Sequence, residues 1–343
     1  MSATILFTCK EGYEKVLSRE IAEDSLKVIS KGRGWLLAAP DETPSSSKTY
    51  VLDNIPCFAY FIFESPTLIN TTSVNSLTEQ LITLFSTHYA KTRITESWPL
   101  SFTSSGIEQL LQHEKSVKKN WLVKMRKRMS KITKLAHEGI PHRSKFSEGF
   151  FVHFASFDQI FVSFKACSAG QQRMRMDTSA PSRSYLKIEE AFRVFGVEPQ
   201  KKETVIDLGA APGGWSFSAL NRGALVTAID NGPLKGPVKT HANVRHLIEN
   251  ALTYKHMKNK PVDWLLCDVL EEPDIIFKLL EKWLKQKWCR YFIANIKVGR
   301  NDPILLLKKF RHNQKGLSRL CDPFIMRQLY HDREEITLMG RVK

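Results

Sequence analysis

The sequence predicts an α/β fold in its C-terminal half, with a separate α+β region before it. From Tyr185 onward, short apolar segments alternate with amphipathic segments of helical length, which is typical of a parallel sheet with helices on both faces. Before residue 170, strand-like segments occur in pairs joined by short polar turns, which favours hairpins. The polar, non-periodic stretch 170–184 separates the two patterns and predicts a domain boundary.

Composition limits the classes of protein that this chain can be. Its 343 residues allow two or three domains, and the hydrophobic fraction of 42% is ordinary for a globular protein. No apolar run reaches the ~18–20 residues of a membrane span, and the N-terminus turns polar too early for a signal peptide. We therefore expect a cytoplasmic protein without a membrane partner.

Cysteine usage and charge add two expectations. The six cysteines are scattered and form no C-x-x-C pair, which argues against a zinc site or a disulfide partner and fits a reducing compartment. The formal net charge of +16 predicts a polyanionic partner. Charge alone leaves RNA, DNA and an acidic membrane surface open.

Residues 1–170 are predicted to form two α+β pieces. Residues 1–55 would form a small subdomain, and residues 56–170 a second domain. The first piece should contain a strand, a helix and two strands over 3–9, 11–25, 26–29 and 35–39. The second should contain, in order, a strand, a helix, a strand, a basic helix and a hairpin over 57–65, 74–89, 99–103, 115–134 and 150–166.

The basic helix has two faces of different character. An apolar stripe recurs at i, i+4, i+8 and i+11 and predicts core packing; it consists of Trp121, Met125, Met129 and Ile132. Between these positions lies a basic face that could bind the phosphates of a nucleic acid, formed by Lys124, Arg126, Lys127 and Arg128. A solvated outer face explains the same pattern, and both interpretations remain open.

Residues 171–343 are predicted to form the parallel sheet. Five strands are expected over 204–208, 224–229, 244–248, 264–267 and 290–296, with helices over 214–220, 275–287 and 303–312. Two further strands, 324–330 and 335–339, are joined by a tight polar connection, which predicts an antiparallel hairpin at one edge of the sheet.

A glycine loop follows the first of these strands. The strand Val205–Leu208 runs into small residues and then a helix, and ligands of doubly wound sheets bind at this place. Pro212 interrupts the dinucleotide G-x-G-x-x-G pattern, and no Gly-Lys-Ser/Thr follows, so a P-loop is excluded. Asp230 ends the second strand, where a carboxylate can accept both ribose hydroxyls of an adenosine ligand. The candidate ligand residues of the loop are Asp207, Gly209, Ala210, Pro212, Gly213, Gly214 and Trp215.

The motif DLGAAPGGWS resembles the first motif of the FtsJ-like ribose 2′-O-methyltransferases, and the resemblance extends from Ser182 to the C-terminus. It implies a Rossmann-like, seven-stranded methyltransferase domain whose cofactor is S-adenosylmethionine, with no metal. It also implies cofactor contacts for Asp230, Asp268 and Asn250. At the last position many relatives carry an aspartate that contacts the adenine amino group, and the amide oxygen of Asn250 can still accept a hydrogen bond.

The resemblance further implies a Lys-Asp-Lys-Glu catalytic tetrad. The segment Ser182–Lys187 resembles the S-R-x-x-x-K motif of the family, which implies an RNA contact for Arg183. The resemblance implies that Lys297 is the base and that Asp268 and Glu335 orient it. It implies that Lys187 holds the nucleotide and stabilises alkoxide charge. Glu334 is the alternative to Glu335, because neighbouring strand residues face opposite sides of a sheet.

Segments around 267–273, 283–290 and 328–335 resemble bacterial enzymes that methylate a cytidine 2′-hydroxyl of 23S ribosomal RNA. This resemblance implies that residues 56–170 form a THUMP-like RNA-binding domain and residues 1–55 a ferredoxin-like piece. The expected partner is 23S rRNA or a large-subunit precursor, bound by a monomer. Two alternatives remain: a cytosine C5 enzyme with Cys267 as nucleophile, and a catalytically silent RNA-binding or ribosome-assembly protein that keeps the methyltransferase fold.

Overall fold

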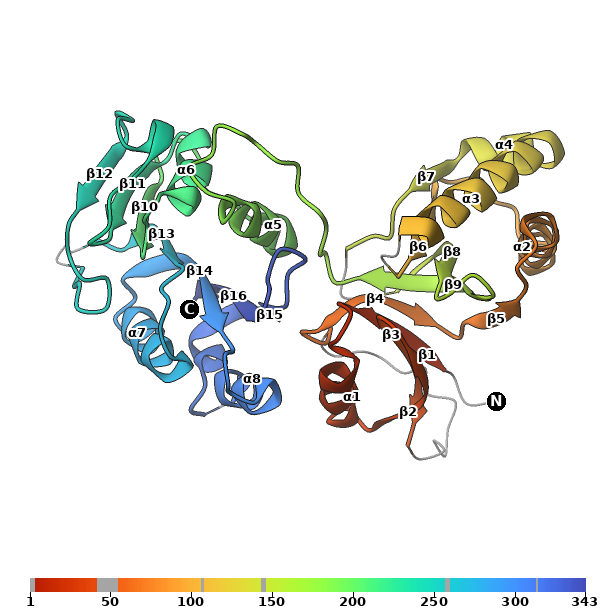
Figure 1. Cartoon of the computed structure of the whole chain (residues 1–343), viewed down its shortest axis with the longest axis horizontal. Helices are drawn as coiled ribbons and strands as arrows, with labels where there is room; N and C mark the ends of the chain where they lie inside the picture. The colour runs from red at the N-terminus through yellow and green to blue at the C-terminus, as the bar shows by residue number, and fades with distance from the viewer. Residues whose placement is uncertain (1–3, 42–54, 106–107, 143–145, 257–259, 313) are drawn as a thin grey trace. The chain divides into compact units, whose positions relative to one another are not determined.

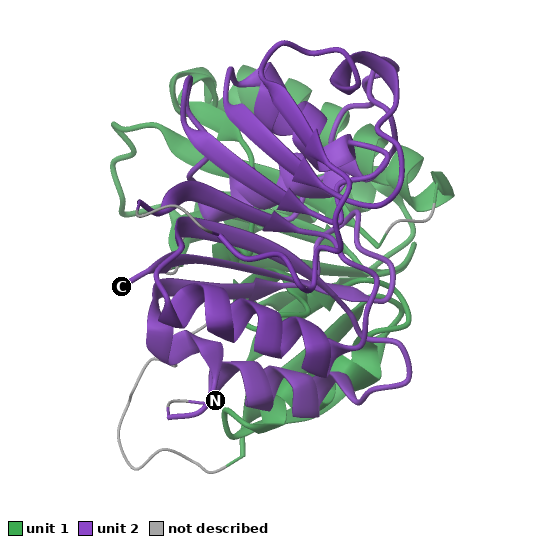
Figure 2. Ribbon diagram, turned by 90° about the vertical axis from the view of Figure 1, so that its left-hand side faces the viewer, with its two compact units in different colours: residues 1–170 green, residues 171–343 purple. Residues whose placement is uncertain are grey.

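The computed structural model describes residues 4–41, 55–105, 108–142, 146–256, 260–312 and 314–343. The chain divides into two compact units, residues 1–170 and 171–343 (Figures 1 and 2). The division falls at the start of the polar stretch 170–184. Within the described residues, no helix is long and apolar enough to cross a membrane.

The first unit is built on one mixed sheet. Its strand order is β2-β3-β1-β4-β9-β8-β6-β7, and β5 also pairs with β9. The antiparallel pair of β1 and β4 joins the segments before and after residue 55 in this sheet. A separate subdomain of residues 1–55 therefore stays a prediction. The strands are β1 (Ile5–Cys9), β2 (Leu26–Gly32), β3 (Trp35–Pro40), β4 (Ala59–Glu64), β5 (Thr67–Asn70), β6 (Trp98–Ser104), β7 (Ala136–Glu138), β8 (Ser147–Phe154) and β9 (Gln159–Ser168).

Helices α2 and α3 pack on this sheet through an aromatic core. Trp121 lies at the centre of the core, where it stacks on Phe150 and meets Phe85 edge-on. The predicted single helix 115–134 is wrong, because the chain breaks at Met129, whose φ of −139° and ψ of 52° are not helical. The helices of this unit are α1 (Glu14–Ala22), α2 (Val74–His88), α3 (Glu108–Arg128) and α4 (Ser130–Lys134).

The second unit is built on a seven-stranded sheet of order β12-β11-β10-β13-β14-β16-β15. The first five strands in this order are parallel, and β16 runs antiparallel to both of its neighbours. This arrangement confirms the predicted α/β class and the antiparallel edge. The strands are β10 (Thr204–Leu208), β11 (Leu225–Ile229), β12 (Val244–Leu247), β13 (Val262–Cys267), β14 (Cys289–Lys297), β15 (Cys321–Arg327) and β16 (Glu335–Val342).

Helices cover both faces of this sheet (Figure 1). Alternate strand residues such as Val205, Leu266 and Ile293 share a buried cluster with residues of α5 and α6. Because side chains alternate along a strand, the intervening buried residues face α7 and α8 on the opposite side. The helices are α5 (Tyr185–Phe195), α6 (Gly214–Asn221), α7 (Pro273–Lys285) and α8 (Pro303–Arg311), with short 3₁₀ turns η1 (Gly236–Val238) and η2 (Leu317–Leu320).

The last predicted strand pair needs one correction. The strand expected over 324–330 is β15, Cys321–Arg327, so residues 328–330 belong to the connection that leads into β16. Leu329 is fully buried in this connection, and its N–H donates to the carboxylate of Asp332. The apolar residues that suggested a longer strand therefore belong to a buried turn.

Candidate active site

The glycine loop lies at the carboxyl end of β10, between that strand and α6. Gly213 caps α6 with a φ of +114°, a conformation that glycine adopts without strain. Gly214 lies against residues 182–185, because a Cβ at this position would stand 2.3 Å from Ser184 Oγ. Asp230, which follows β11, accepts the N–H of Ala211 (2.9 Å) and of Gly232 (2.7 Å). The loop is therefore fixed by hydrogen bonds and close packing before any ligand arrives.

Two predicted ligand residues of the loop lie beneath its surface. Asp207 is fully buried and accepts the Ser216 hydroxyl at 2.6 Å, and burial raises the pKa of Asp207 to about 7. Its second oxygen, Oδ1, and the Nε1 of Trp215 are buried without a hydrogen-bond partner in the described structure. The side chains of Asp207 and Trp215 are therefore buried in the protein interior and support the loop.

Another predicted cofactor residue, Asn250, is exposed in the turn after β12. Its amide oxygen accepts the N–H of Leu252 at 2.8 Å and retains a second lone pair. Asp230 and Asn250 follow adjacent parallel strands, so both lie at the carboxyl edge of the sheet beside the glycine loop. Acceptors at these positions and open backbone at the loop fit an adenosine ligand, which has ribose hydroxyls and an amino group to donate.

The structure brings the four predicted catalytic residues together. Lys297 Nζ contacts Asp268 Oδ1 at 2.9 Å and Glu335 Oε1 at 2.6 Å. Lys187, in the first turn of α5, donates to the other oxygen of Glu335. Lys297 ends β14 and Glu335 opens β16, and the two residues are paired directly in the antiparallel ladder. Glu334 is exposed, so Glu335 is the glutamate that contacts both lysines.

This cluster is partly buried, and contacts among its own charged groups outweigh the effect of burial on their pKa values. Burial alone would raise the pKa of Glu335, but hydrogen bonds from Lys187 and Lys297 outweigh it and lower the pKa to about 2. Burial likewise opposes charge on Lys297, yet Asp268 and Glu335 outweigh it and raise the pKa of Lys297. Without a bound ligand, Lys297 is therefore an ammonium held between two carboxylates.

Two residues behind the cluster were missed by the sequence reasoning. Asn295, fully buried on β14, donates to Glu335 Oε2 (3.3 Å) and to Asp332 Oδ1 (3.4 Å). Asp332 is buried as well, and burial raises its pKa to about 7. The available signal was a polar residue two positions before Lys297 in an otherwise apolar strand, since residues two apart share a face.

Glu190 ties the surrounding segments together. It lies on the buried face of α5 and accepts backbone N–H groups from Tyr330 (2.8 Å), His331 (3.0 Å) and Gln172 (3.1 Å). Burial raises its pKa to about 8, although the three donors favour the charged form. One carboxylate thus joins α5, which carries Lys187, to the connection before β16 and to the segment after residue 170.

The structure also places the predicted RNA contacts. Arg183 is exposed just before α5. On α3, Lys124 and Arg128 contact Glu79 of α2 at 2.8 and 2.9 Å, whereas Arg126 and Lys127 are exposed. Half of the predicted basic face is thus engaged in an ion-pair network within the unit.

The alternative nucleophile, Cys267, does not have the surroundings of a reactive thiol. Cys267 is fully buried, and burial raises the pKa of its thiol to about 12, so a reactive thiolate is disfavoured. The other five cysteines are also buried, and no disulfide joins them within the described structure. Among the described residues, no group of three or more His, Cys, Asp or Glu side chains could hold a metal ion.

The sheet order, the glycine loop at its carboxyl edge and the lysine–carboxylate cluster define a Rossmann-like domain of the methyltransferase kind. Residues 180–320 match the FtsJ-like methyltransferase family, and the second unit has that fold. The matched range includes Lys187, Asp268 and Lys297, while Glu335 lies beyond it.

The chain is also similar to proteins named ribosomal RNA large subunit methyltransferase M. The relative from Thauera aminoaromatica is 39% identical over 182 residues, which are 51% of this chain and 50% of the relative. The relative from Aggregatibacter aphrophilus is 35% identical over 190 residues, or 50% of each chain. The chain thus matches about half the length of these relatives. The crystal structure of a possible methylase from Clostridium difficile covers 100% of this chain and 98% of its own at 13% identity, and its TM-score of 0.36 supports no inference.

Gly213→Ala should weaken binding of S-adenosylhomocysteine, measured by calorimetry, and lower the stability by about 1–3 kcal/mol, since an alanine is strained in this backbone region. Gly196→Ala is the matched control: Gly196 has a φ of +74° at the end of α5, with nothing within 4 Å of an added Cβ. It should lower stability without changing ligand affinity. Equal affinities of the two variants would contradict a ligand role for the loop.

Proposed function

We propose that this protein transfers a methyl group from S-adenosylmethionine to a ribose 2′-hydroxyl of RNA. The observation that carries the proposal is Lys297, held between Asp268 and Glu335 at the carboxyl edge of the sheet where the glycine loop lies. A ribose hydroxyl is a weak nucleophile, and a positioned base is what its activation requires. The substrate is a cytidine of 23S ribosomal RNA, which the similarity to large-subunit methyltransferases supports.

The glycine loop, Asp230 and Asn250 would hold the cofactor. When bound there, S-adenosylmethionine supplies a methyl group activated by its sulfonium charge. Asp230 would accept the ribose hydroxyls and Asn250 the adenine amino group, while the loop backbone approaches the ligand at Gly209 and Gly213.

Lys297 accepts the proton of the 2′-hydroxyl, and Asp268 and Glu335 stabilise the ammonium that results. The raised pKa of Lys297 means that this lysine must first lose a proton. A further positive charge beside Lys297, such as the sulfonium of the bound cofactor, would lower its pKa. The ammonium would then release its proton to solvent and leave a neutral amine that can accept the 2′-hydroxyl proton. Lys187, held by Glu335 in the absence of substrate, stabilises negative charge on the 2′-oxygen.

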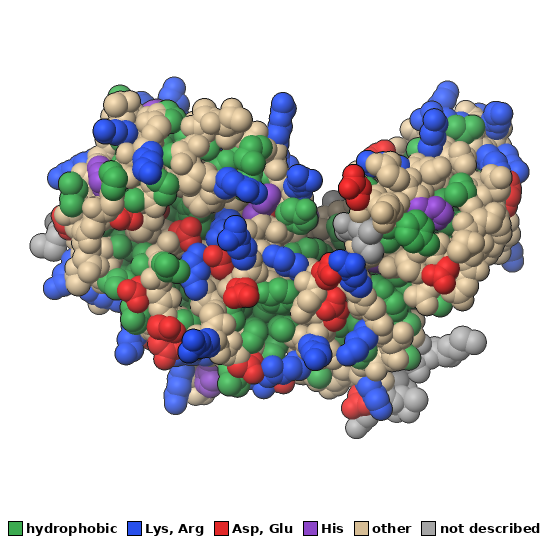
Figure 3. All heavy atoms as spheres, in the orientation of Figure 1, with side chains coloured by type: hydrophobic (Ala, Val, Ile, Leu, Met, Phe, Trp, Pro, Cys, Tyr) green, Lys and Arg blue, Asp and Glu red, His purple; other side chains and the backbone are tan. Residues whose placement is uncertain are grey.

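The first unit would deliver the RNA. Its mixed sheet, its helices and the exposed Arg126 and Lys127 suit a THUMP-like RNA-binding domain acting together with a ferredoxin-like piece. Figure 3 shows Lys and Arg side chains on the visible surface of both units, in keeping with the net charge of +16. We propose that a monomer acts in the cytoplasm on 23S rRNA or a large-subunit precursor.

The test uses purified full-length protein, tritiated S-adenosylmethionine and 23S rRNA transcribed in vitro without modifications. We expect label in the RNA and an alkali-resistant labelled linkage, because a methylated 2′-oxygen cannot attack the neighbouring phosphate. Label in an alkali-labile position would indicate base methylation instead. Binding of RNA without any label transfer would favour the silent assembly protein.

Arg126→Gln/Lys127→Gln should weaken RNA binding and reduce the slope of log affinity against log salt by about 1–2, since each phosphate contact contributes close to one unit. Filter binding at several KCl concentrations measures this slope. Lys27→Gln/Lys31→Gln removes the same charge from exposed positions of β2 and should leave it unchanged. Equal slopes in wild type and in both variants would show that the basic face of α3 is a solvated surface without an RNA contact.

A further inference from the structure

A basic pocket of the second unit lies beside the lysine–carboxylate cluster. It has a volume of about 420 Å³, and its polar lining consists of Arg173, Arg175, Arg183 and His331. Met174, Met176 and Leu186 supply its apolar wall. We propose that this arginine pocket binds a backbone phosphate of the substrate RNA strand next to the target nucleotide. This inference rests on the proposed function and names how that site recognises its substrate.

The segment that carries two of these arginines is irregular but firmly attached. The N–H of Met174 donates to Nε2 of His331 at 2.9 Å, and the hydroxyl of Tyr185 donates to the carbonyl of Arg175 at 3.0 Å. Gln172 donates to the buried Glu190. Three hydrogen bonds within four residues hold the backbone in place, so the arginine side chains extend from a fixed backbone. Preorganisation of this kind lowers the entropic cost of binding.

The charge of the pocket is not neutralised by the protein. In the described part of the chain, the guanidinium groups of Arg173, Arg175 and Arg183 make no ion pair, and all three residues are exposed. Guanidinium groups bind phosphate oxygens through paired N–H donors. The methionines and Leu186 add an apolar surface on which a neighbouring base can pack. The combination suits a nucleotide strand better than a small inorganic anion.

Two residues that line the pocket are adjacent in sequence to residues that contact Glu335 or lie behind it. Leu186 lines the pocket, and the next residue, Lys187, contacts Glu335. His331 lines the pocket as well, and the next residue, Asp332, bonds to Asn295 behind the same glutamate. A phosphate held by the arginines would therefore belong to the same RNA strand as the ribose that the cluster activates, close to it along the RNA backbone. The pocket would set which nucleotide reaches Lys297.

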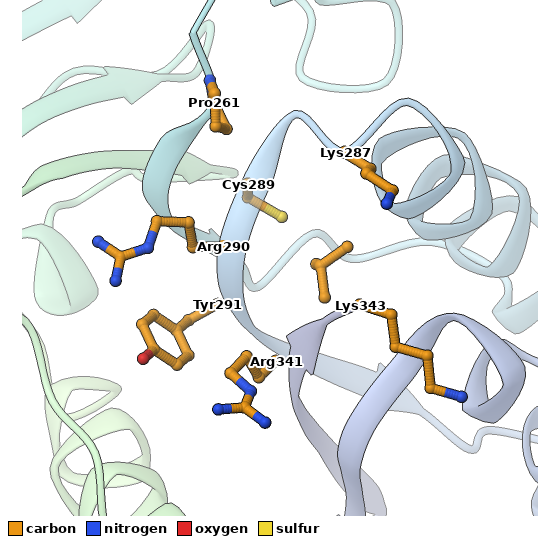
Figure 4. A pocket seen from close by; sticks show the side chains of 8 residues that line it. Pro261, Lys287, Cys289, Arg290, Tyr291, Arg341 and Lys343 are labelled. Carbon is orange, nitrogen blue, oxygen red and sulfur yellow. The ribbon is translucent and has the colours of Figure 1, made fainter.

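A second basic pocket provides a matched control. It lies where β14 begins and β16 ends, at the sheet edge opposite to the glycine loop, and Figure 4 shows its basic residues Lys287, Arg290, Arg341 and Lys343. Here three of the four cations have partners within the protein: Arg290 contacts Asp263 at 2.8 Å, Arg341 donates to the carbonyl of Asp322, and Lys343 donates to that of Arg319. We expect no RNA contact at this edge.

The experiment compares Arg173→Gln/Arg175→Gln with Lys287→Gln/Arg341→Gln, which removes the same charge at the opposite edge. Binding of in vitro transcribed 23S rRNA is measured across KCl concentrations, together with kcat and KM for RNA and the affinity for S-adenosylhomocysteine. In the first variant we expect a salt slope smaller by about 1–2, a KM for RNA raised about tenfold and unchanged S-adenosylhomocysteine affinity. The control should match wild type.

Arg173→Lys/Arg175→Lys keeps the charge and should restore most of the salt slope, which separates a phosphate contact from a folding defect. A wild-type slope and KM in the Gln variant, or equal losses in the opposite-edge control, would overturn the inference. Absence of methyl transfer by wild type would instead refute the proposed function, and the RNA-binding slopes would still decide whether the pocket contacts RNA.

Discussion

Lys297→Met should reduce methyl transfer to RNA by about 10²–10⁴-fold, the usual contribution of a general base. The lysine Nζ lies within 3 Å of both Asp268 and Glu335, so its removal takes away the proton acceptor and leaves two neighbouring carboxylates. Single-turnover transfer of tritiated methyl groups measures the effect. Binding of S-adenosylhomocysteine should persist, since Lys297 lies outside the proposed cofactor contacts.

Lys297→Arg distinguishes a base from a structural cation. Arginine preserves the positive charge between Asp268 and Glu335, but its guanidinium stays protonated at any usable pH. We expect a folded protein with stability near wild type and transfer as low as in the Met variant. Recovery of activity in the Arg variant would show that the site needs only a positive charge, and the assigned base would be wrong. Lys287→Met, at the opposite edge of the sheet, is the control for loss of a surface lysine.

Glu335→Gln should lower the free energy of unfolding at pH 7 by on the order of 3 kcal/mol. The reason is that the pKa of Glu335 is about 4.3 in the unfolded chain and about 2 in the folded protein. A depressed carboxyl pKa stabilises the fold fully above the unfolded value. That contribution is lost as the pH falls from about 5 to about 2. The difference between wild type and variant in urea unfolding should therefore shrink over that interval.

Glu334→Gln is the matched control for this substitution, because Glu334 is exposed and adjacent in sequence. Its unfolding free energy should follow wild type at every pH. The Glu335 variant should also transfer methyl groups more slowly, since it frees Lys187 and Lys297 from their shared carboxylate. A stability difference that stays constant from pH 7 to pH 3 would contradict the paired, ionised state of Glu335.

The fold of the second unit could be predicted from sequence because its signals are local. Parallel strands buried on both faces form continuous apolar runs, and the glycine loop marks the place where β10 meets α6. Asp230, Asp268 and Lys297 could be assigned to one edge for the same reason, since each follows or ends a parallel strand. The antiparallel edge was predictable from two strands with a short connection, although β15 begins earlier than its apolar pattern suggested.

Pairing and burial were decided only by the tertiary structure. No local pattern distinguishes Glu335 from Glu334; the register of β16 against β14 places Glu335 opposite Lys297. The hydrogen-bond partners of Asn295 and Glu190 were decided only when a strand and a helix buried these two residues against residues distant in sequence. The charge state of Lys297 depends on a balance between burial and two carboxylates that meet in space. By itself, the sequence determined the helices and strands and the types of residue at their ends. Long-range contacts decided which of these residues form hydrogen bonds and ion pairs with one another.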